Sequence, residues 1–358
     1  MDNLRGITFG KWLKLLSQNG YAVDGPYLDR AAAATLLSLR NSYWRRVEVR
    51  RFGAAVEQAR LQPPLFILGH WRNGTTLLHE LLIMDPQFAY PNVFEVANPH
   101  VFLTLGDRVA RALKDEPAQK RPMDNMQVRF DSPGEDEFAL AVVSLRSPVL
   151  GWTFPRREAY YDRYYTFRDV PAAEINEWKC AFAWFMRKLS YKYGRPLVLK
   201  SPPHTGRVRL LLELFPEARF IHITRDPYTV FRSTQNLYAK AVPFSHLQRP
   251  DPAQVDAGIL RRYADIYDVY LEERARIPPG RLCEVRFEDL ERDVVGQVGL
   301  IYEQLGLPGF AALRPRLEAY VAARANYQKN AHPPLDPALR ERVAQAWGRY
   351  FAAWGYPV

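Results

Sequence analysis

The sequence predicts an α/β fold in which a mostly parallel sheet is flanked by helices. Four short apolar runs, at 65–68, 196–200, 219–225 and 281–287, have the pattern of strands that are buried on both faces. A segment with helical character follows each run, and strands that alternate with helices in this way form parallel sheets. With 358 residues, 47% of them apolar, the chain can bury a large core.

An added helical segment, residues 1–60, is expected to precede the sheet. Its stretch AAAATLLSLRNSYWRRVEVRRF combines strong helix formers with several arginines, namely Arg40, Arg45, Arg46, Arg50 and Arg51. This composition fits a helix with a solvated basic face, and it also fits a basic amphipathic helix that lies on anionic lipid. Pro63 and Pro64 end the region. We therefore place a domain boundary near residue 60.

The main domain, 61–358, is expected to contain an insertion of helical and irregular structure at about 87–194. Outside the insertion, the predicted helices are 75–83, 204–215, 227–238, one that ends near Leu305, and a closing amphipathic helix at the carboxyl end. Asp85-Pro86 stops the first of them. Inside the insertion, one helix face is marked by apolar residues spaced 3, 4, 3 and 4: Ile175, Trp178, Phe182, Phe185 and Leu189.

Charge and cysteine content limit the kind of protein and its compartment. The formal net charge of +10 favours anionic partners, which leaves nucleic acid, an acidic membrane surface and a phosphorylated ligand open. The two cysteines, Cys180 and Cys283, argue against a disulfide framework or a zinc cluster. No apolar run approaches the ~18 residues of a membrane span. We expect a cytoplasmic protein whose membrane contact, if any, is at the surface.

Cations follow the predicted strands at the point where each strand ends. Arg72, Lys200 and Arg225 lie in the loops 69–75, 200–204 and 225–227. Ligands of parallel sheets bind beyond the carboxyl ends of the strands. We therefore expect these three loops to share an anionic ligand.

The first of these loops, in FILGHWRNGTTLLHELL (66–82), has the spacing of a phosphate-binding loop. Gly69 and Gly74 lie five apart, as in G-x-x-x-x-G-K-[ST], and their freedom lets successive N–H groups face one concavity. The helix that starts at about Thr75 adds its positive end, and Thr75 and Thr76 add hydroxyl donors. Thr75 replaces the lysine of a kinase loop, whereas Arg72 supplies a cation inside the loop. The pattern favours an anion loop over a magnesium-dependent kinase site.

A second signal is TRDPYTVFRST (224–234). Arg225 ends a predicted strand, and Ser233 lies nearly two turns along the following helix. An arginine fork and a helix hydroxyl can share one phosphate. By itself this pair is also compatible with a charged turn in which Asp226 caps the helix.

Together these segments resemble the PAPS-dependent sulfotransferases, especially bacterial members of that family. The resemblance rests on R-N-G-T-T at 72–76, on the Arg225…Ser233 spacing, and on DSPGEDEFAL, LVLKSPPHTGR, FPEARFIHITRDPYTVFRST and RFEDL in this order. It runs from about residue 61 to 310. Asn73 departs from the family loop, where serine is commoner, but asparagine can still donate to an anion.

The resemblance implies a donor and a set of roles. The donor would be 3′-phosphoadenosine 5′-phosphosulfate (PAPS), transfer would need no metal, and Arg72 and Lys200 would contact the transferring group. The 5′-phosphosulfate would lie on residues of the first loop: Gly69, Arg72, Asn73, Gly74, Thr75 and Thr76. The 3′-phosphate would meet Arg225 and Ser233, and Lys329 in NYQKNAHPP would fold over it as a basic loop does in relatives.

Sulfuryl transfer to a hydroxyl also needs a base that accepts the proton. Glu95, about 20 residues after the loop, resembles the glutamate that some sulfotransferases use. His100, in the same segment, and His204, beside Lys200, are alternatives because other members use histidine. We expect Glu95 to be the base.

The acceptor is indicated only by composition. The insertion is rich in aromatic residues, which suggests an apolar or ring-bearing alcohol, although such residues also build cores. With the basic amino-terminal helix, a lipid-like acceptor and peripheral membrane contact are expected, without nucleic acid as a partner. Two alternatives stay open: a phosphate-loop kinase or other nucleotide-binding protein, and a basic protein that binds membranes or nucleic acid.

Overall fold

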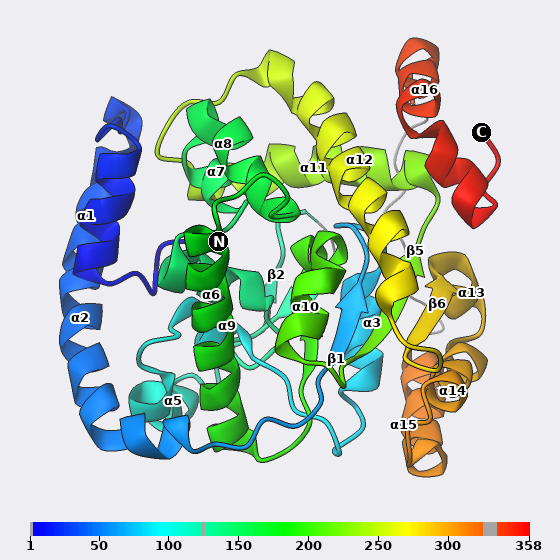
Figure 1. The fold of residues 1–358 in the computed structure, drawn as a ribbon, viewed down its shortest axis with the longest axis horizontal. Coiled ribbons are helices and arrows are strands. Elements are labelled where there is room, and N and C mark those ends of the chain that lie inside the picture. The colour runs from blue at the N-terminus through cyan, green and yellow to red at the C-terminus, as the bar shows by residue number, and fades with distance from the viewer. Residues whose placement is uncertain (1–2, 124–125, 325–334) are drawn as a thin grey trace. The chain divides into compact units, whose positions relative to one another are not determined.

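The computed structural model describes residues 3–123, 126–324 and 335–358 (Figure 1). Contacts within the chain define two compact units. The first comprises Met1–Gln62, Tyr90–Gly194 and Tyr238–Ala253, and the second comprises Pro63–Ala89, Arg195–Leu237 and Gln254–Val358. Within the described ranges, every helix is too short or too polar to cross a bilayer.

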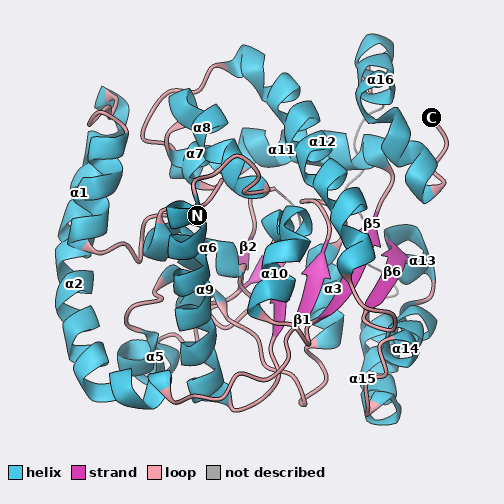
Figure 2. Cartoon of the chain, in the orientation of Figure 1, coloured by secondary structure: helices cyan, strands magenta, loops and turns pink. Residues whose placement is uncertain are grey.

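The second unit is built on a four-stranded parallel sheet, shown as magenta arrows in Figure 2. Its strands are β1 (Leu65–Leu68), β4 (Val198–Lys200), β5 (Arg219–Thr224) and β6 (Leu282–Arg286), in the order β4-β1-β5-β6. Phe66 of β1 lies opposite both Leu199 and Phe220, so β1 is a central strand. The predicted α/β fold with a mostly parallel sheet is confirmed, and all four strands fall within the ranges that the sequence predicts.

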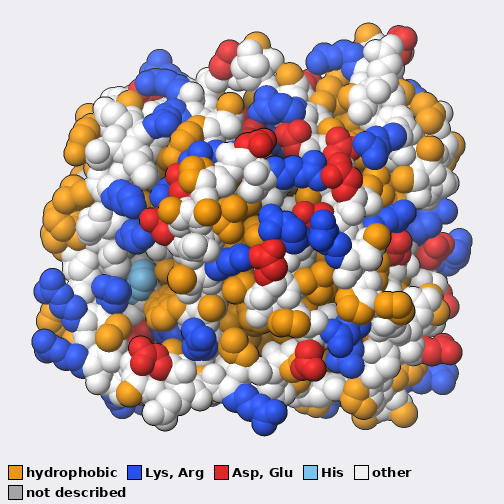
Figure 3. All heavy atoms as spheres, in the orientation of Figure 1, with side chains coloured by type: hydrophobic (Ala, Val, Ile, Leu, Met, Phe, Trp, Pro, Cys, Tyr) orange, Lys and Arg blue, Asp and Glu red, His pale blue; other side chains and the backbone are white. Residues whose placement is uncertain are grey.

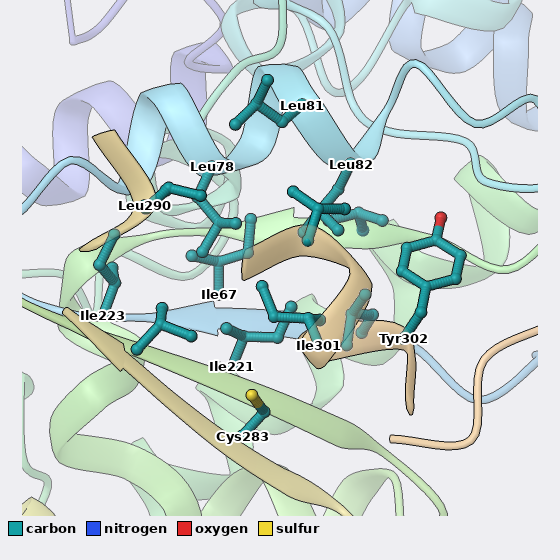
Figure 4. Packing of buried hydrophobic residues seen from close by; sticks show 14 of the residues in the cluster. Ile67, Leu78, Leu81, Leu82, Ile221, Ile223, Cys283, Leu290, Ile301 and Tyr302 are labelled. Atoms are coloured by element: carbon teal, nitrogen blue, oxygen red, sulfur yellow. The ribbon is translucent and has the colours of Figure 1, made fainter. Parts of the chain in front are cut away.

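Helices of the second unit are α3 (Thr75–Leu82), α10 (Val208–Leu214), α12 (Val255–Glu273), α13 (Phe287–Arg292), α14 (Val294–Gln304), α15 (Phe310–Ala323) and α16 (Pro337–Trp354). Helix α11 (Pro227–Lys240) begins in this unit and ends in the first. One hydrophobic core joins the sheet to α3, α13, α14 and α15 (Figure 4). Ile67, Ile221 and Cys283 enter it from three strands, which positions the carboxyl ends of those strands.

Two predicted helices of this unit are interrupted. The segment predicted as 204–215 begins with a 3₁₀ turn at Pro202–Arg207, where Gly206 has non-helical dihedral angles, and α10 starts only at Val208. The helix predicted to end near Leu305 is divided into α13 and α14. Asp293 causes this break because its carboxylate accepts from the N–H of Gly296 and caps α14.

The first unit is mostly helical. It contains α1 (Phe9–Gln18), α2 (Leu28–Glu57), α4 (Val93–Ala97), α5 (Phe102–Ala112), α6 (Asp136–Ser144), α7 (Leu150–Thr153), α8 (Glu158–Asp162), α9 (Ala172–Tyr193) and a hairpin of β2 (Gln119–Lys120) and β3 (Gln127–Val128). The stripe predicted from the 3, 4, 3, 4 spacing lies in α9, where Trp178, Phe182 and Phe185 are fully buried. The arginine-rich stretch lies within α2.

Candidate active site

The loop between β1 and α3 has a backbone that requires glycine at two positions. Gly69 has φ 145° and Gly74 has φ 90°, both in the region that side chains rarely adopt. A Cβ on Gly69 would lie 2.7 Å from the carbonyl oxygen of Ile223, and one on Gly74 would lie 2.1 Å from the Phe287 ring. Arg72 also has a positive φ, 74°, so the chain reverses sharply between the two glycines.

Neutral hydrogen bonds from neighbouring elements hold this loop in shape. The N–H of Gly69 donates to Thr205 Oγ1 at 2.7 Å, and the N–H of His70 donates to the Tyr267 hydroxyl at 3.0 Å. The Asn73 amide donates to that hydroxyl at 2.7 Å and to the carbonyl oxygen of Ile223 at 2.9 Å. We expected Asn73 to donate to an anion. In the structure its buried amide instead donates to groups of the protein and positions the loop.

Arg72, Arg225 and Ser233, from three different segments, converge beside the loop. The Nε of Arg72 donates to Ser233 Oγ at 2.8 Å, and Nη1 of Arg225 donates to the carbonyl oxygen of Arg72 at 3.0 Å. The Arg225 guanidinium also lies over the Phe287 ring, 4.1 Å from its centre. The structure thus brings together the two sequence signals that are 153 residues apart.

Lys200 joins the same end of the sheet. It is the last residue of β4 and is almost fully buried, and its Nζ lies 3.5 Å from Thr76 Oγ1 in the first turn of α3. Gly74, which precedes this helix, offers no side chain to cap it. The N–H groups at the start of α3 and the Lys200 ammonium therefore lie close to each other at the end of the loop.

The electrostatics of this cluster favour a bound anion. Burial lowers the pKa of Arg225, and the nearby Arg72 cation lowers it further. Glu288, Glu291 and Asp226 oppose this effect on the pKa only in part. Among the described residues, Arg225 forms no ion pair within 4 Å. A ligand with two negative charges would relieve the repulsion between the guanidinium groups and could accept hydrogen bonds from both.

The three candidate bases lie in two different units. His204 belongs to the unit that holds the loop, where it is fully buried with its ring edge-on to Phe66 at 5.5 Å. Glu95 and His100 belong to the first unit and are also buried.

Glu95 is surrounded by hydrogen-bond donors. Its carboxylate accepts from the Asn92 N–H at 2.9 Å, completing a capping box at the start of α4. It also accepts from Lys192 Nζ at 2.6 Å and from the Tyr193 hydroxyl at 2.7 Å. This geometry fixes α4 against α9 and leaves little of the carboxylate for an incoming proton.

His100 is buried beside an aromatic ring. Its ring lies 5.3 Å from that of Trp184, and neither ring nitrogen has a hydrogen-bond partner among the described residues. Burial holds its pKa well below the usual value, and the nearby Lys188 cation lowers it further. The remaining candidate, Lys329, lies outside the described residues.

Three residues that position the site were not singled out from the sequence, although two of them lie in segments that carry the family resemblance. Tyr267 and Thr205 hold the loop, and Phe287 closes over Gly74 and supports Arg225. Phe287 is part of the RFEDL segment, but nothing in that segment indicates its contact with a loop more than 200 residues away. Tyr267 belongs to a helical run of tyrosines in α12 that is typical of a core.

Comparison with known proteins decides the family. A sequence model described as the sulfotransferase family matches residues 63–312, which is most of the chain. The chain belongs to the sulfotransferase family. The matched range starts in the residues before β1 and includes both anion-site segments.

Curated relatives and solved structures agree with this assignment. The omega-hydroxy-beta-dihydromenaquinone-9 sulfotransferases Stf3 of Mycobacterium bovis and Mycobacterium tuberculosis are each 37% identical over 355 residues, which is 98% of this chain and 90% of each relative. Sulfotransferase STF9 from Mycobacterium avium has a similar fold, with a TM-score of 0.67 and 18% identity over 99% of this chain and 98% of that one. STF1 from M. tuberculosis also gives a TM-score of 0.67, covering 95% and 92% of the two chains.

The protein is thus an enzyme that transfers a sulfuryl group, and the resemblance noted in its sequence is confirmed. PAPS is the donor on which the sulfotransferase family depends. This family assignment replaces the alternative of a phosphate-loop kinase.

Proposed function

We propose that this sulfotransferase moves the sulfuryl group of PAPS to the hydroxyl group of a lipid-like apolar alcohol. The observation that carries the donor half of the proposal is the convergence of Arg72, Arg225 and Ser233 beside a preformed glycine loop. A doubly anionic nucleotide fits this cluster because the Arg72 and Arg225 cations repel each other when no anion is bound.

Each part of the donor has residues suited to hold it. The backbone from Gly69 to Gly74 and the hydroxyl groups of Thr75 and Thr76 would bind the 5′-phosphosulfate. Arg225 and Ser233 would bind the 3′-phosphate, together with Lys329. The guanidinium of Arg72 reaches Ser233 while its backbone belongs to the loop, so this residue would connect the two phosphate sites.

The transfer step requires positive charge where negative charge develops. PAPS supplies the sulfuryl group, which passes in line from the leaving oxygen to the attacking oxygen, by analogy with phosphoryl transfer. Lys200, 3.5 Å from Thr76 at the start of α3, would stabilise the leaving oxygen, and Arg72 would assist. This role needs no metal ion.

For the base, the location of His204 in the same unit as the loop favours it over Glu95. Glu95 is already bonded to three donors in a capping network, whereas His204 follows Lys200 by four residues in the unit that holds the loop. We therefore propose that His204 accepts the proton of the acceptor hydroxyl. Turnover of the variants His204→Gln, His100→Gln and Glu95→Gln separates the candidates: loss of kcat with unchanged PAP affinity identifies the base, and normal kcat in His204→Gln would return the role to Glu95 or His100.

A lipid-like acceptor is supported by the named relatives and by one helix face. The curated relatives, at 37% identity, are sulfotransferases of a menaquinone derivative. On α2, Leu36, Leu39 and Tyr43 follow a helical stripe and are 69%, 48% and 62% exposed. Hydrophobic and basic side chains share the surface at the left of the space-filling view, where α1 and α2 lie (Figure 3). We propose that this face makes peripheral contact with a membrane.

Two measurements test the function. Calorimetry with the desulfated product PAP should show binding that chelation of Mg²⁺ does not change, and a preference for ATP–Mg²⁺ would contradict the proposal. A panel of acceptors should then show sulfate transfer from PAPS to long-chain apolar alcohols. Turnover confined to sugars would refute the acceptor class while leaving the donor site intact.

The membrane contact has its own test. Cosedimentation with vesicles should weaken in the variant Leu36→Ser/Tyr43→Ser. The variant Phe244→Ser/Val321→Ser, which removes two exposed apolar side chains outside α2, serves as the matched control. Equal sedimentation of the parent and the double variant would refute the contact.

A further inference from the structure

The first unit contains a pocket that the sulfuryl transfer just described does not use. It has a volume of about 370 Å³ and is lined by residues of the amino-terminal segment, α2, α4, α5 and the chain near Phe130. That volume lies in the range of about 300–1,000 Å³ that small-molecule sites occupy. The thirteen lining residues in the described part of the chain all belong to the first unit.

Apolar side chains form most of its wall. They come from α2, α4, α5 with the residue that follows it, and the chain near Phe130, and they include aromatic rings and aliphatic side chains: Trp44, Val93, Phe94, Leu105, Val109, Leu113 and Phe130. Trp44 and Phe94 are half-buried, so their rings remain accessible from the pocket. A wall of this kind favours a ligand with an apolar chain or ring.

Three arginines, Arg5, Arg40 and Arg108, line the same pocket, and they come from three separate segments. Among the described residues that line the pocket, none is acidic. Within the described part of the chain, none of these arginines forms an ion pair or a side-chain hydrogen bond. Elsewhere in this unit arginines do have carboxylate partners, as Arg146 has in Glu174 and Glu177.

We propose that this pocket binds an anionic amphiphile, that is, one phosphate or carboxylate head group joined to an apolar chain. The guanidinium groups at the pocket would hold the head group through charge-assisted hydrogen bonds, and the wall would bury the first part of the chain. The three arginines are exposed, so a purely apolar ligand would leave their charges to water and gain nothing from them, whereas a small inorganic anion would leave the apolar wall in water. Only an amphiphile satisfies both parts of the pocket.

Calorimetry with soluble short-chain lipids tests this proposal. The probes are dihexanoyl-phosphatidylglycerol below its micellar concentration, dihexanoyl-phosphatidylcholine, and inorganic phosphate. The phosphatidylglycerol should bind with 1:1 stoichiometry and at least about tenfold more tightly than the other two, because each charge-assisted bond contributes about 1.5–3 kcal/mol. Equal affinity for the two lipids, or binding of phosphate as tight as that of the anionic lipid, would overturn the proposal.

Paired charge variants separate the pocket from a general basic surface. Arg40→Gln/Arg108→Gln removes two lining cations, and Arg46→Gln/Arg50→Gln removes two exposed cations of α2 that do not line the pocket. The first variant should lose at least about tenfold in affinity for the anionic lipid, whereas the second should bind like the parent. Equal losses in both would show attraction to surface charge alone and would refute the site.

A variant that fills the pocket provides an independent check. Val109→Trp adds bulk to a half-buried position of the wall without changing charge. It should abolish binding of the short-chain anionic lipid while retaining the parent's PAP affinity and unfolding transition. Unchanged lipid binding in this variant would refute the pocket as the site. Vesicles of phosphatidylglycerol, tested in parallel, show whether the ligand is taken from a membrane or from solution.

Discussion

Arg225 gives the sharpest test of the donor site, because the structure predicts a large effect on nucleotide affinity and a small effect on stability. The change Arg225→Met keeps an apolar stem against the Phe287 ring and removes the guanidinium. Among the described residues, this cation has one hydrogen-bond acceptor, the Arg72 carbonyl oxygen. Burial lowers its pKa, and the nearby Arg72 cation lowers it further.

The magnitudes follow from those contacts. A guanidinium bound to the 3′-phosphate by two charge-assisted hydrogen bonds contributes about 3–6 kcal/mol, at about 1.5–3 kcal/mol each. PAP affinity should therefore fall by at least about a hundredfold, since 1.4 kcal/mol is about tenfold. The unliganded protein loses one hydrogen bond and a ring contact, but it also loses a buried cation beside another cation. Its free energy of unfolding should change by less than about 2 kcal/mol.

Calorimetry with PAP and urea unfolding of the unliganded protein measure the two quantities. Arg292→Met is the matched control because Arg292 is an exposed arginine of the same unit, with a side chain that is 76% exposed. PAP affinity within about threefold of the parent in Arg225→Met, which is about 0.7 kcal/mol, would refute the role of Arg225. Loss of affinity together with collapse of the fold would show that Arg225 is structural.

Three further outcomes are expected. Gly74→Ala should lower the free energy of unfolding by about 2–5 kcal/mol in urea titrations, from the strained φ of 90° and the clash with Phe287, whereas Gly348→Ala, with open space around it, should not. Lys200→Ala should lower kcat at least about a hundredfold while PAP affinity changes little, and the control Lys240→Ala should leave kcat unchanged. A normal kcat in Lys200→Ala would show that Lys200 does not stabilise the leaving oxygen. Burial lowers the pKa of His70 to about 4, so the unfolded state takes up this proton first as the pH falls. Stability should drop by about 2 kcal/mol between pH 7 and pH 5, and a His70→Gln variant that keeps the same slope would contradict this assignment.

The sheet could be predicted because its strands carry their own signal. Runs such as LFIL at β1 and RFIHIT at β5 are buried on both faces, so nearly every residue is apolar or packed, and each run is bounded by proline, glycine or charge. The sequence thereby also places Arg72, Lys200 and Arg225 at strand ends, which parallel strands bring to one edge. The positions of residues far apart in the sequence could be predicted here from the local strand pattern and from the rule that parallel strands end at the same edge of a sheet.

Side-chain partners that depend on tertiary packing could not be predicted in the same way. Glu95 is a plausible base in the sequence, but in the structure its carboxylate is enclosed by Lys192 and Tyr193, which lie almost 100 residues further along the chain. Asn73 looks like an anion donor and is instead bonded to Tyr267. Neither partner is adjacent in sequence, and neither belongs to a recognisable motif.

Different residues shape the loop and carry its positive charge, and this explains how a site for a strongly charged ligand can form before the ligand binds. Neutral donors and acceptors from Thr205 and Tyr267 fix the backbone of the loop, so its shape does not depend on an anion. The cations Arg72 and Arg225 are held beside it at an electrostatic disadvantage. Binding a doubly charged nucleotide then removes a repulsion without having to order the loop, and both effects favour affinity. The stabilisation that PAP binding gives the fold should consequently be lost when Arg225 is neutralised. The variant Tyr267→Phe leaves two buried N–H donors without their acceptor, so it should lower the free energy of unfolding even when no nucleotide is present.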